Sequence, residues 1–406
     1  MEEGRRATAI VCALSISVTT SFGVLYYAFG AFLPSMERSL GWSKLTLTGA
    51  YSLALLVSGL TGMVIGRHLD RHSPRLSMTA GSLLGGAGVL AWSYVRSPLA
   101  LYGAFAMIGI SMGATLYDPS FVVLTRWFHG TGRTRALTIV TLFAGLASTI
   151  FIPLEVRLIR NLEWRPALRV LALVLVCITV PLHALVLTSP PDPPPAVRAA
   201  SSSLGDALRD SRFWYLIGAV FLVSVTFSAL TAHQLSFLQE RGWKAGSAAA
   251  AVSLTGLWQL GSRVIFSPLA RVVAPRVLTV LVYASQLVAL AVLAISTRPV
   301  VVALFVACTG VSRGMYTLVR ATLVADLFGS ASYGAIAARV GLSSLVAQSI
   351  GPILGSALHS GPGGYTTMLC VLAGLAGGAT VLAGQIQRLP IAAPAMLSTA
   401  FDNSAQ

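Results

Sequence analysis

The chain has 406 residues, of which 55% are hydrophobic and only 10% are charged, and its mean hydropathy is +0.78. A water-soluble protein of this length carries about a quarter charged residues, so the composition excludes an ordinary soluble enzyme. The formal net charge of +15 does not indicate nucleic acid as a partner, because the basic residues stand mostly in short segments between apolar blocks.

The apolar residues form blocks of roughly 20 residues, the length that crosses a hydrocarbon layer of about 30 Å as a helix. The first block follows "MEEGRR" and is too long for a cleaved signal sequence, so we expect a retained helix. The pattern predicts an all-α polytopic membrane protein with twelve transmembrane helices, at residues 9–33, 45–66, 75–95, 99–125, 135–157, 167–188, 213–238, 247–269, 276–296, 299–323, 333–357 and 365–386.

The four cysteines lie inside predicted spans, without a CxxC spacing or a neighbouring histidine cluster, so we expect no metal site. The sequence has no HExxH, P-loop or dinucleotide motif, and we expect no cofactor. The segment "GVSRG" (310–314) fits G-x-S-x-G but lies inside an apolar span, whereas a nucleophilic serine elbow needs a strand, a turn and a helix. We therefore predict that the protein is not an enzyme.

Basic residues in the loops indicate the orientation of the chain. With the N-terminus inside, 14 Lys and Arg residues fall on the cytoplasmic side and 10 on the outer side. Loops rich in Lys and Arg stay in the cytoplasm. The count predicts a multi-pass protein of the inner (plasma) membrane with both termini cytoplasmic, and we expect it to be a monomer in contact with membrane lipids.

A Pro- and Ser-rich segment divides the spans into six and six, as an interdomain linker does. Sliding the chain on itself by 201 residues aligns three dipeptides, Gly-Trp, Ser-Leu and Pro-Arg, and places the second span on the eighth. This common offset favours a duplication. The predicted units are an N-terminal half at 1–188, a cytoplasmic linker at 189–212, a C-terminal half at 213–388 and a tail at 389–406.

The loop "GRHLDRHSPR" at 66–75 resembles the signature between helices 2 and 3 of the major facilitator superfamily, roughly G-x-x-x-D-R-x-G-R-R. Ser73 and Pro74 depart from that pattern. The residues that match are Gly66, Asp70, Arg71 and Arg75. The resemblance implies two pseudo-symmetric six-helix halves that alternate access to a central site.

Further segments resemble the monocarboxylate-transporter-like branch of that superfamily. They are "LGWSKLTLTGAYSLALLVSGL" (40–60), "LYDPSFVVLTRWF" (116–128), "GRTRAL" (132–137), "LEWRPAL" (162–168) and "DLFG" (326–329). The resemblance covers most of the chain.

The charged loop itself has two interpretations that act together. In the resembling family the carboxylate at Asp70 contacts the N-terminus of helix 11 in the other half, and an arginine ending helix 4, here Arg126, supports it. A helix N-terminus favours a carboxylate because of its free N–H groups and its dipole. Such a contact closes the cytoplasmic side. The loop arginines also fix the orientation and bind anionic lipid.

Ionisable groups at membrane depth are costly and are functional candidates by default. Five stand out within the predicted spans, namely Asp118, Arg263, Arg313, Arg320 and Arg339. The excess of cations over carboxylates favours an anionic substrate. Arg320 and Arg339 lie closer to the cytoplasmic ends, where long side chains can reach the membrane surface.

Arg263 follows Gly261 and Ser262, which leave space around a guanidinium that can bind a carboxylate with two hydrogen bonds. The resemblance implies that Arg263 pairs with the substrate carboxylate, and Gln259 occupies the position where animal relatives carry a proton-accepting aspartate. The alternative is that Arg263 fixes its helix to a neighbour. Arg313, near mid-span, is a second candidate ligand.

Asp118 precedes Pro119, which interrupts the helical hydrogen bonds. A carboxylate there can couple protons to substrate movement, or it can form a permanent ion pair that only holds helices together. Tyr27 is a candidate substrate ligand because it resembles an aromatic position in helix 1. His233 either lines the outer part of the pathway or packs with satisfied hydrogen bonds.

The sequence thus predicts a secondary active transporter that moves a small organic anion, monocarboxylate-like, with proton coupling. One alternative is a proton-coupled drug or metabolite efflux antiporter of the same fold. Another is a sensor or scaffold that binds a ligand without transporting it.

Overall fold

A computed structural model describes residues 2–69, 72–128, 130–188, 208–328 and 333–386. These residues are helical, and none of them forms a β-strand. Several helices continue one another through a π-helical turn or a short break. The helices of the first part are α1 (Glu2–Ser21), η1 (Phe22–Tyr27), α2 (Ala28–Leu40), α3 (Lys44–Leu69), α4 (Pro74–Ser93), α5 (Pro98–Thr115), α6 (Tyr117–Trp127), α7 (Gly130–Gly145), α8 (Ala147–Leu162), α9 (Trp164–Pro181) and η2 (Leu182–Val186).

The second part of the chain consists of longer, uninterrupted helices. They are α11 (Ser211–Glu240), α12 (Ala245–Val272), α13 (Pro275–Ile295), α14 (Pro299–Phe328), α15 (Tyr333–His359) and α16 (Gly364–Ile386).

Ten helical segments are long and apolar enough to cross a membrane. Two predicted spans, which correspond to α4 and α12, are not among the ten. Both are rich in Gly, Ala and Ser, and α12 also carries Gln259 and Arg263, so their hydropathy is low. The all-helical membrane fold is confirmed, while the count of twelve spans remains a prediction for these two helices.

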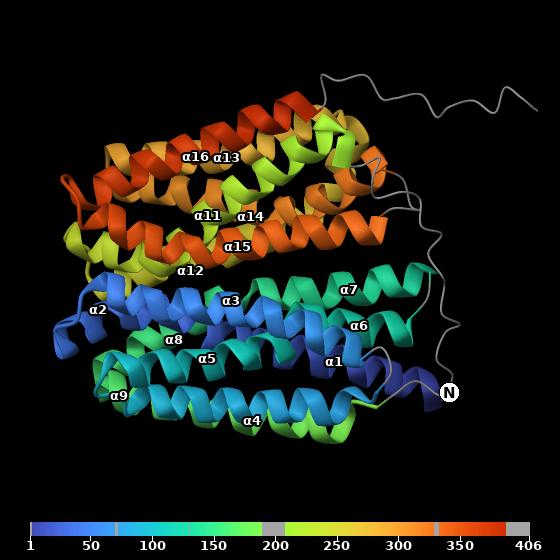
Figure 1. The fold of residues 1–406 in the computed structure, drawn as a ribbon, viewed down its shortest axis with the longest axis horizontal. Helices are drawn as coiled ribbons and strands as arrows, with labels where there is room; N and C mark the ends of the chain where they lie inside the picture. Colours follow the sequence, from blue (N-terminus) through green and yellow to red (C-terminus); the bar gives the residue numbers. More distant parts are fainter. Residues whose placement is uncertain (1, 70–71, 129, 189–207, 329–332, 387–406) are drawn as a thin grey trace, which may run out of the picture.

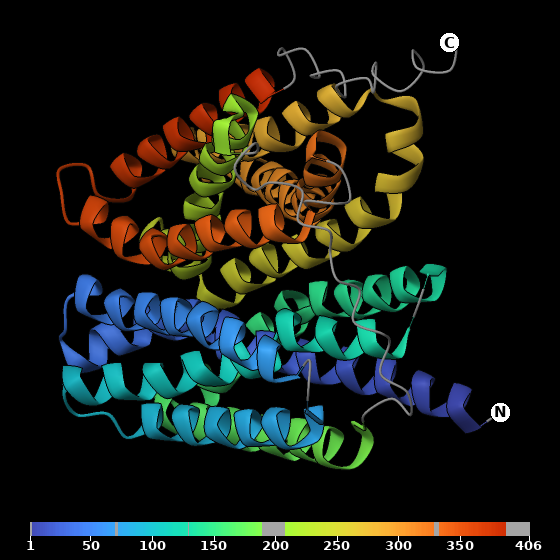
Figure 2. The same ribbon diagram turned by 45° about the vertical axis from the view of Figure 1, so that its right-hand side comes forward.

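The helices form two groups that follow the order of the chain. Helices from α1 to η2 lie together in one group, and helices from α11 to α16 lie together in the other (Figures 1 and 2). Across the boundary α3 packs on α15, α8 on α12, and α2 on α11. The boundaries that the sequence predicts for the two halves and the linker are consistent with this grouping, but they remain predictions.

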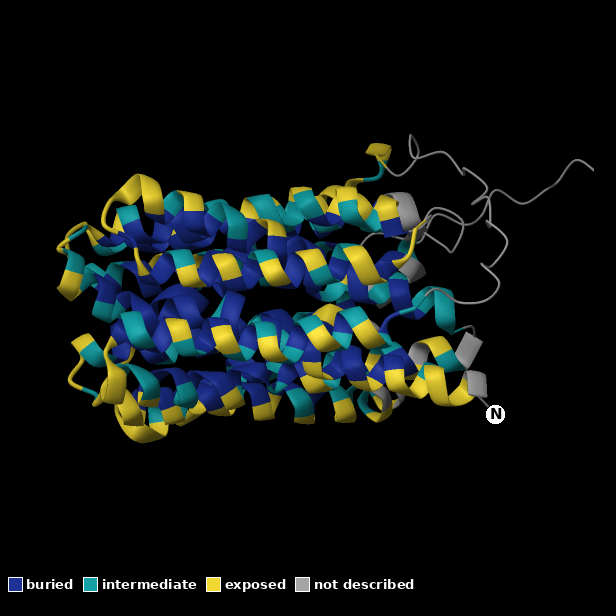
Figure 3. Cartoon of the chain, turned by 90° about the horizontal axis from the view of Figure 1, so that it is seen from below, coloured by how far each residue is buried: buried dark blue, intermediate teal, exposed yellow. Residues whose placement is uncertain are grey.

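All the long helices run roughly along one axis, so the bundle has two ends (Figure 1). We call the end that carries the start of α1 and the end of α16 the near end. The opposite end, with the turns at 41–43, 241–244 and 360–363, is the far end. Buried positions face the interior of the bundle and exposed ones its outer surface (Figure 3). Apolar side chains such as Leu99 (83% exposed) and Ile295 (84% exposed) cover that surface, as a lipid environment requires.

Small residues allow close packing within each group. In α5, a Cβ at Gly113 would lie 2.8 Å from the backbone nitrogen of Gly62 in α3, so only glycine fits. Gly351 and Gly355 of α15 meet α11 in the same way. These contacts explain why so many "small-xxx-small" segments occur in the sequence.

One interruption of a predicted span bears directly on the site. The span at 99–125 breaks at Leu116, between α5 and α6, where ψ is −148°. The hydroxyl of Ser120 donates to the Leu116 carbonyl at 2.8 Å, which compensates for part of the lost helical bonding. Asp118 and Pro119 lie directly after this break, so the carboxylate stands at a helix start inside the bundle.

Candidate functional site

A cavity of about 480 Å³ lies between the two groups of helices. The first group contributes aromatic side chains and one carboxylate, and the second contributes one arginine and several polar or small side chains. The polar and aromatic lining residues are Phe22, Tyr26, Ser58, Tyr117, Asp118, Arg320, Ser344 and Gln348. The cavity is therefore amphipathic, with one acidic and one basic group.

Asp118 is exposed toward this cavity and packs against α3, where a Cβ at Gly62 would lie 3.3 Å from its Oδ2. The positive charge of Arg320 acts on the carboxylate, although the two do not form an ion pair in the described part of the chain. Asp118 thus faces space that water or substrate can enter. Arg320 lines the same cavity, although sequence reasoning ranked it lower as a substrate ligand than Arg263 and Arg313.

Arg263 of α12 joins the two groups of helices. Its Nη1 donates to the Thr141 carbonyl of α7, and its Nε donates to the Gly314 carbonyl of α14 at 3.3 Å. It also interacts electrostatically with Tyr117. Its partners are therefore neutral, so its full positive charge is retained between the halves.

Arg313 of α14 has a similar arrangement. Its Nη2 donates to the Phe227 carbonyl and to the Thr231 hydroxyl, the latter at 2.7 Å, and its guanidinium lies 5.1 Å from the centre of the Phe227 ring. Tyr26 of η1 interacts with it electrostatically across the boundary. Like Arg263, it forms no ion pair within the described residues.

Arg263 and Arg313 do not line the cavity, and the other two predicted substrate ligands near the centre do not line it either. Tyr27 stacks edge-on against Tyr26, with ring centres 5.1 Å apart. Gln259 is buried, and its Nε2 has no hydrogen-bond partner in the described structure. An amide that lacks a partner in the interior is available to a ligand that reaches it.

His233 lies in a different place, toward the far end. It is fully buried and contacts the Pro352 carbonyl at 3.0 Å, the Tyr365 hydroxyl at 3.3 Å and the Ser356 hydroxyl at 3.4 Å. This arrangement favours the packing alternative over a place in the substrate pathway.

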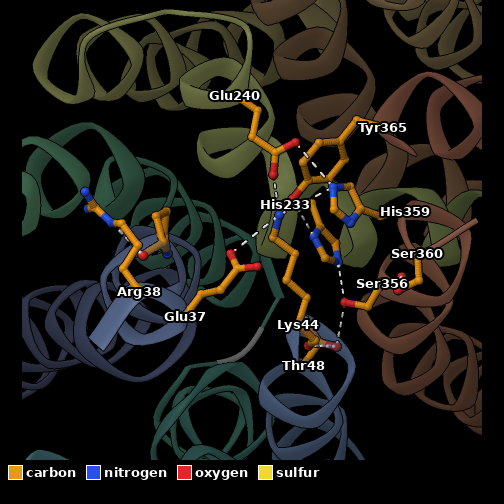
Figure 4. A network of polar contacts seen from close by, with 11 residues as sticks. Glu37, Arg38, Lys44, Thr48, His233, Glu240, Ser356, His359, Ser360 and Tyr365 are labelled. Atoms are coloured by element: carbon orange, nitrogen blue, oxygen red, sulfur yellow. Dashed lines mark hydrogen bonds and ion pairs between the residues drawn. The ribbon is translucent and has the colours of Figure 1, made fainter. Parts of the chain in front are cut away.

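A network of charged residues lies at the far end (Figure 4). Lys44 of α3, whose side chain is only 6% exposed, forms an ion pair with Glu37 at 3.5 Å and another with Glu240 of α11. His359 of α15 contacts Glu240 at 3.3 Å and Lys44 at 3.4 Å. The network therefore joins both groups of helices.

A second contact between the groups lies one turn deeper. The hydroxyl of Thr48 donates to that of Ser356 at 2.8 Å in a buried position. Sequence reasoning missed this network because Glu37, Lys44 and Glu240 stand at span ends, where charges are ordinary. The one signal was that Lys44 is one of only two lysines in a chain that otherwise uses arginine.

The near end contains the predicted gating residues. Asp70 and Arg71 lie outside the described residues. Arg126 donates to the carbonyls of Leu69 at 2.5 Å and His72 at 3.0 Å, so it joins the end of α3 to the residues just before α4.

The other two gating candidates differ in their surroundings. Arg75 donates to the Leu187 carbonyl at 3.2 Å, which ties α4 to the end of η2. A Cβ at Gly66 would meet nothing within 4 Å, so packing in this conformation does not require glycine there.

Two further features concern chemistry. No group of three or more His, Cys, Asp or Glu side chains that could hold a metal occurs in the described ranges. Ser312 of "GVSRG" is buried in the middle of α14, where its hydroxyl donates to the Val282 carbonyl at 2.9 Å. It is a helix-packing residue and cannot act as a nucleophile.

Comparison with known proteins agrees with this architecture. The model of the Major Facilitator Superfamily matches residues 14–306. Monocarboxylate transporter 13 of Bos taurus is 27% identical over 382 residues, which cover 92% of this chain and 84% of the relative. The oxalate:formate antiporter of Oxalobacter formigenes is 24% identical over 258 residues, which cover 62% of this chain and 60% of that protein. The resemblance to monocarboxylate transporters is thus confirmed.

Solved structures show the same fold. A bacterial homologue of the human lysosomal transporter Spinster, in an inward-facing and unoccupied conformation, has a TM-score of 0.77 at 12% identity, with 94% of this chain and 97% of that chain covered. The nucleoside transporter NupG has a TM-score of 0.70 at 15% identity, with 93% and 98% covered. These relatives and neighbours are transporters, which confirms that the protein is not an enzyme.

Proposed function

The chain belongs to the major facilitator superfamily, and from this premise we propose that it is a secondary active transporter of a small organic anion, monocarboxylate-like and coupled to protons. The observation that carries the proposal is the charge pattern between the halves. Two guanidiniums, at Arg263 and Arg313, have only neutral partners among the described residues, and one carboxylate, at Asp118, faces the cavity.

An anion fits this pattern for an electrostatic reason. A guanidinium donates several hydrogen bonds in one plane and binds a carboxylate with two of them. Backbone carbonyls now accept these bonds from Arg263 and Arg313, so an entering carboxylate can replace neutral acceptors by a charged one. The names of the monocarboxylate and oxalate:formate relatives agree with a carboxylate substrate.

Proton coupling is assigned to Asp118. A carboxylate that faces the cavity and feels the charge of Arg320 can exist in a protonated and an ionised form. The ionised carboxylate repels an anionic substrate. Protonation neutralises the carboxylate and so removes this repulsion. Binding of the proton therefore strengthens binding of the anion, and binding of the anion strengthens binding of the proton, as symport requires.

The conformation supports alternating access. The Lys44 network joins the halves at the far end, where a cavity of about 680 Å³ also lies between them, while the cavity at Asp118 and Arg320 lies toward the near end. We assign the near end to the cytoplasm of an inner (plasma) membrane protein, as the loop charges predict, and this structure to the inward-facing form. Asp70 closes the near end in the other form, on a loop that Arg126 holds. The transporter acts as a monomer in contact with lipids.

The test is transport by the purified protein in liposomes. We expect Asp118→Asn to lose accumulation of a monocarboxylate driven by a pH gradient while keeping exchange of substrate for substrate, because exchange does not require release of the proton. Asp210→Asn is the matched control, since Asp210 pairs with Arg212 at the start of α11, outside the cavity.

Other outcomes decide between the alternatives. Equal loss of both activities in Asp118→Asn indicates a structural role for the carboxylate. Transport of a cationic drug but of no carboxylate favours the efflux antiporter. Ligand binding without any transport favours a sensor or scaffold.

A further inference from the structure

Glu155 of α8 is a second acidic residue inside the bundle, and neither the sequence analysis nor the proposed function uses it. Its side chain is 0% exposed, and neither carboxylate oxygen has a hydrogen-bond partner in the described structure. The residue lies in a segment that is long and apolar enough to cross a membrane, Arg135–Leu162. A buried carboxylate without a partner is rare and calls for an explanation.

Glu155 lies on the buried face of α8. One turn earlier, the ring of Phe151 packs on Gly23 of η1 so closely that a Cβ there would overlap it. Ser148, two turns earlier on the same face, contacts Gly256 of α12 in the other group of helices. Glu155 is thus part of the face by which α8 packs into the bundle, and not of its lipid-facing surface.

Among the described residues, no charged or titratable group on α8 or on the elements packed against it bonds to Glu155. On α8 itself Arg160 contacts Asn161, and Arg157 lines a far-end cavity. On the packed elements the groups are Tyr26 and Tyr27 (ring contacts with each other), Glu37 (with Lys44), Arg38 (with the Pro34 carbonyl), Arg165 (with the Ser93 and Val95 carbonyls), Arg169 (over the Tyr94 ring) and Arg263 (with the Thr141 and Gly314 carbonyls).

Burial without a cation or a donor decides the protonation state. An ionised carboxylate in such surroundings loses its hydration and gains nothing in return, whereas a carboxylic acid is neutral and loses much less. In the conformation described, Glu155 therefore holds a proton on one of its oxygens.

The far end provides a path by which the proton on Glu155 can exchange with water. The residues beside Glu155, Pro153 and Val156, line a far-end cavity of about 680 Å³ whose wall includes α11 and α12 of the other group. When the halves separate at this end, the wall is removed and water reaches this part of α8. Glu155 then exchanges its proton with the water and can ionise.

We propose that Glu155 is a proton-binding site that controls the equilibrium between the two conformations. The O–H bond forms with a proton from far-side water, and the protonated residue is buried when the far end closes. A group that is buried only as the neutral acid favours the closed far end at low pH and the open far end at high pH. The inference rests on the proposed alternating access, but it needs no particular substrate.

The test combines infrared spectroscopy with distance measurements on the full chain in lipid nanodiscs, without substrate. In the wild type we expect a carboxylic acid C=O band that persists when the exposed acids ionise, and we expect this band to be absent in Glu155→Gln. Spin labels at Leu99 and Val300, exposed on the two groups near the far end, should move apart as pH rises in the wild type. Glu155→Gln, which is permanently neutral, should lose that pH dependence.

Glu163→Gln is the matched control, because Glu163 is exposed at the end of the same helix; its band and its distances should match those of the wild type. Glu155→Met is a second neutral variant in case the glutamine variant folds poorly. A pH dependence unchanged in the neutral variants, or the absence of the persistent band from the wild type, overturns the proposal. Because no substrate is present, failure of the proposed anion transport would leave these readouts unaffected.

Discussion

At Arg263 the shape of the guanidinium matters as much as its charge. The group bonds to carbonyls on two helices, α7 and α14, with different nitrogen atoms. We expect Arg263→Lys to reduce transport by roughly ten- to a hundredfold, because one ammonium cannot reproduce a charge-assisted bidentate contact. Initial rates of uptake in liposomes, normalised to protein content, measure the effect.

Arg298→Lys is the control, since Arg298 lies in the far-end turn before α14 and, in the part of the chain that the structure describes, does not bond to both groups of helices as Arg263 does. Arg263 can be a substrate ligand or a residue that holds the helices together. If the lysine variant transports normally, Arg263 is not a substrate ligand. If the unfolding temperature of the lysine variant falls as much as that of Arg263→Ala, the residue mainly holds the helices together.

At this scale the sequence marks charges inside apolar spans but not buried charges at span ends, and the roles of the predicted site residues stay predictions. Asp118, Arg263 and Arg313 could be identified because each interrupts an apolar span, where a charge needs a reason. Glu155 could not, because "EVR" stands at the end of its span and resembles a loop. Burial of Glu155 depends on how α8 packs, and no local pattern encodes it.

Among the helices, α5 carries two glycines with opposite surroundings. A Cβ at Gly113 would lie 2.7 Å from the Thr61 side chain and 2.8 Å from the Gly62 nitrogen, whereas a Cβ at Gly103 meets nothing within 4 Å. We expect Gly113→Ala to destabilise the protein by about 1–3 kcal/mol, as overpacking does. Gly103→Ala should leave stability unchanged or raise it by about 0.5–1 kcal/mol, because alanine favours a helix.

Thermal unfolding of both variants in the same detergent measures the difference. Equal midpoints would show that α3 and α5 can move apart without cost, which contradicts close packing between them.

The elements themselves were predictable from hydrophobic length, but their interruptions were not. Pro119 predicted a break in the helix near Asp118. The π-helical turn at Phe22–Tyr27, in contrast, contains no proline and no charged residue that could predict it. That turn places Tyr26 and Tyr27 toward the centre of the bundle. Its position follows from contacts with α8, which lies more than a hundred residues away in the sequence.

For the whole molecule, the proposed cycle assigns the far-end network a role in holding that side closed. Lys44→Met removes the ion pair with Glu240 of α11, which joins the two groups of helices and is lost when the halves separate at the far end. Because a hydrogen bond to a charged group contributes about 1–3 kcal/mol, the population of the far-open form should rise roughly five- to a hundredfold. Distances between labels at Leu99 and Val300 report the change.

Lys244→Met is a suitable control, because Lys244 is exposed in the other far-end turn and forms no ion pair within the described residues. Identical distance distributions for the two variants would mean that the Lys44 ion pairs do not hold the far end closed.

The neutral surroundings of Arg263 and Arg313 also give the empty transporter an electrical property. When the site of the proposed transporter turns from the cytoplasmic to the outer side with Asp118 ionised, the charges of the two guanidiniums and this carboxylate sum to one positive charge in the membrane field. A potential that is negative inside opposes its movement by about 2.3 kcal/mol for each 100 mV. A bound monovalent anion and a proton on Asp118 together add no charge, so the loaded and the empty transporter turn against the same force. The complete cycle is therefore electroneutral, and accumulation should follow the pH gradient and not the membrane potential.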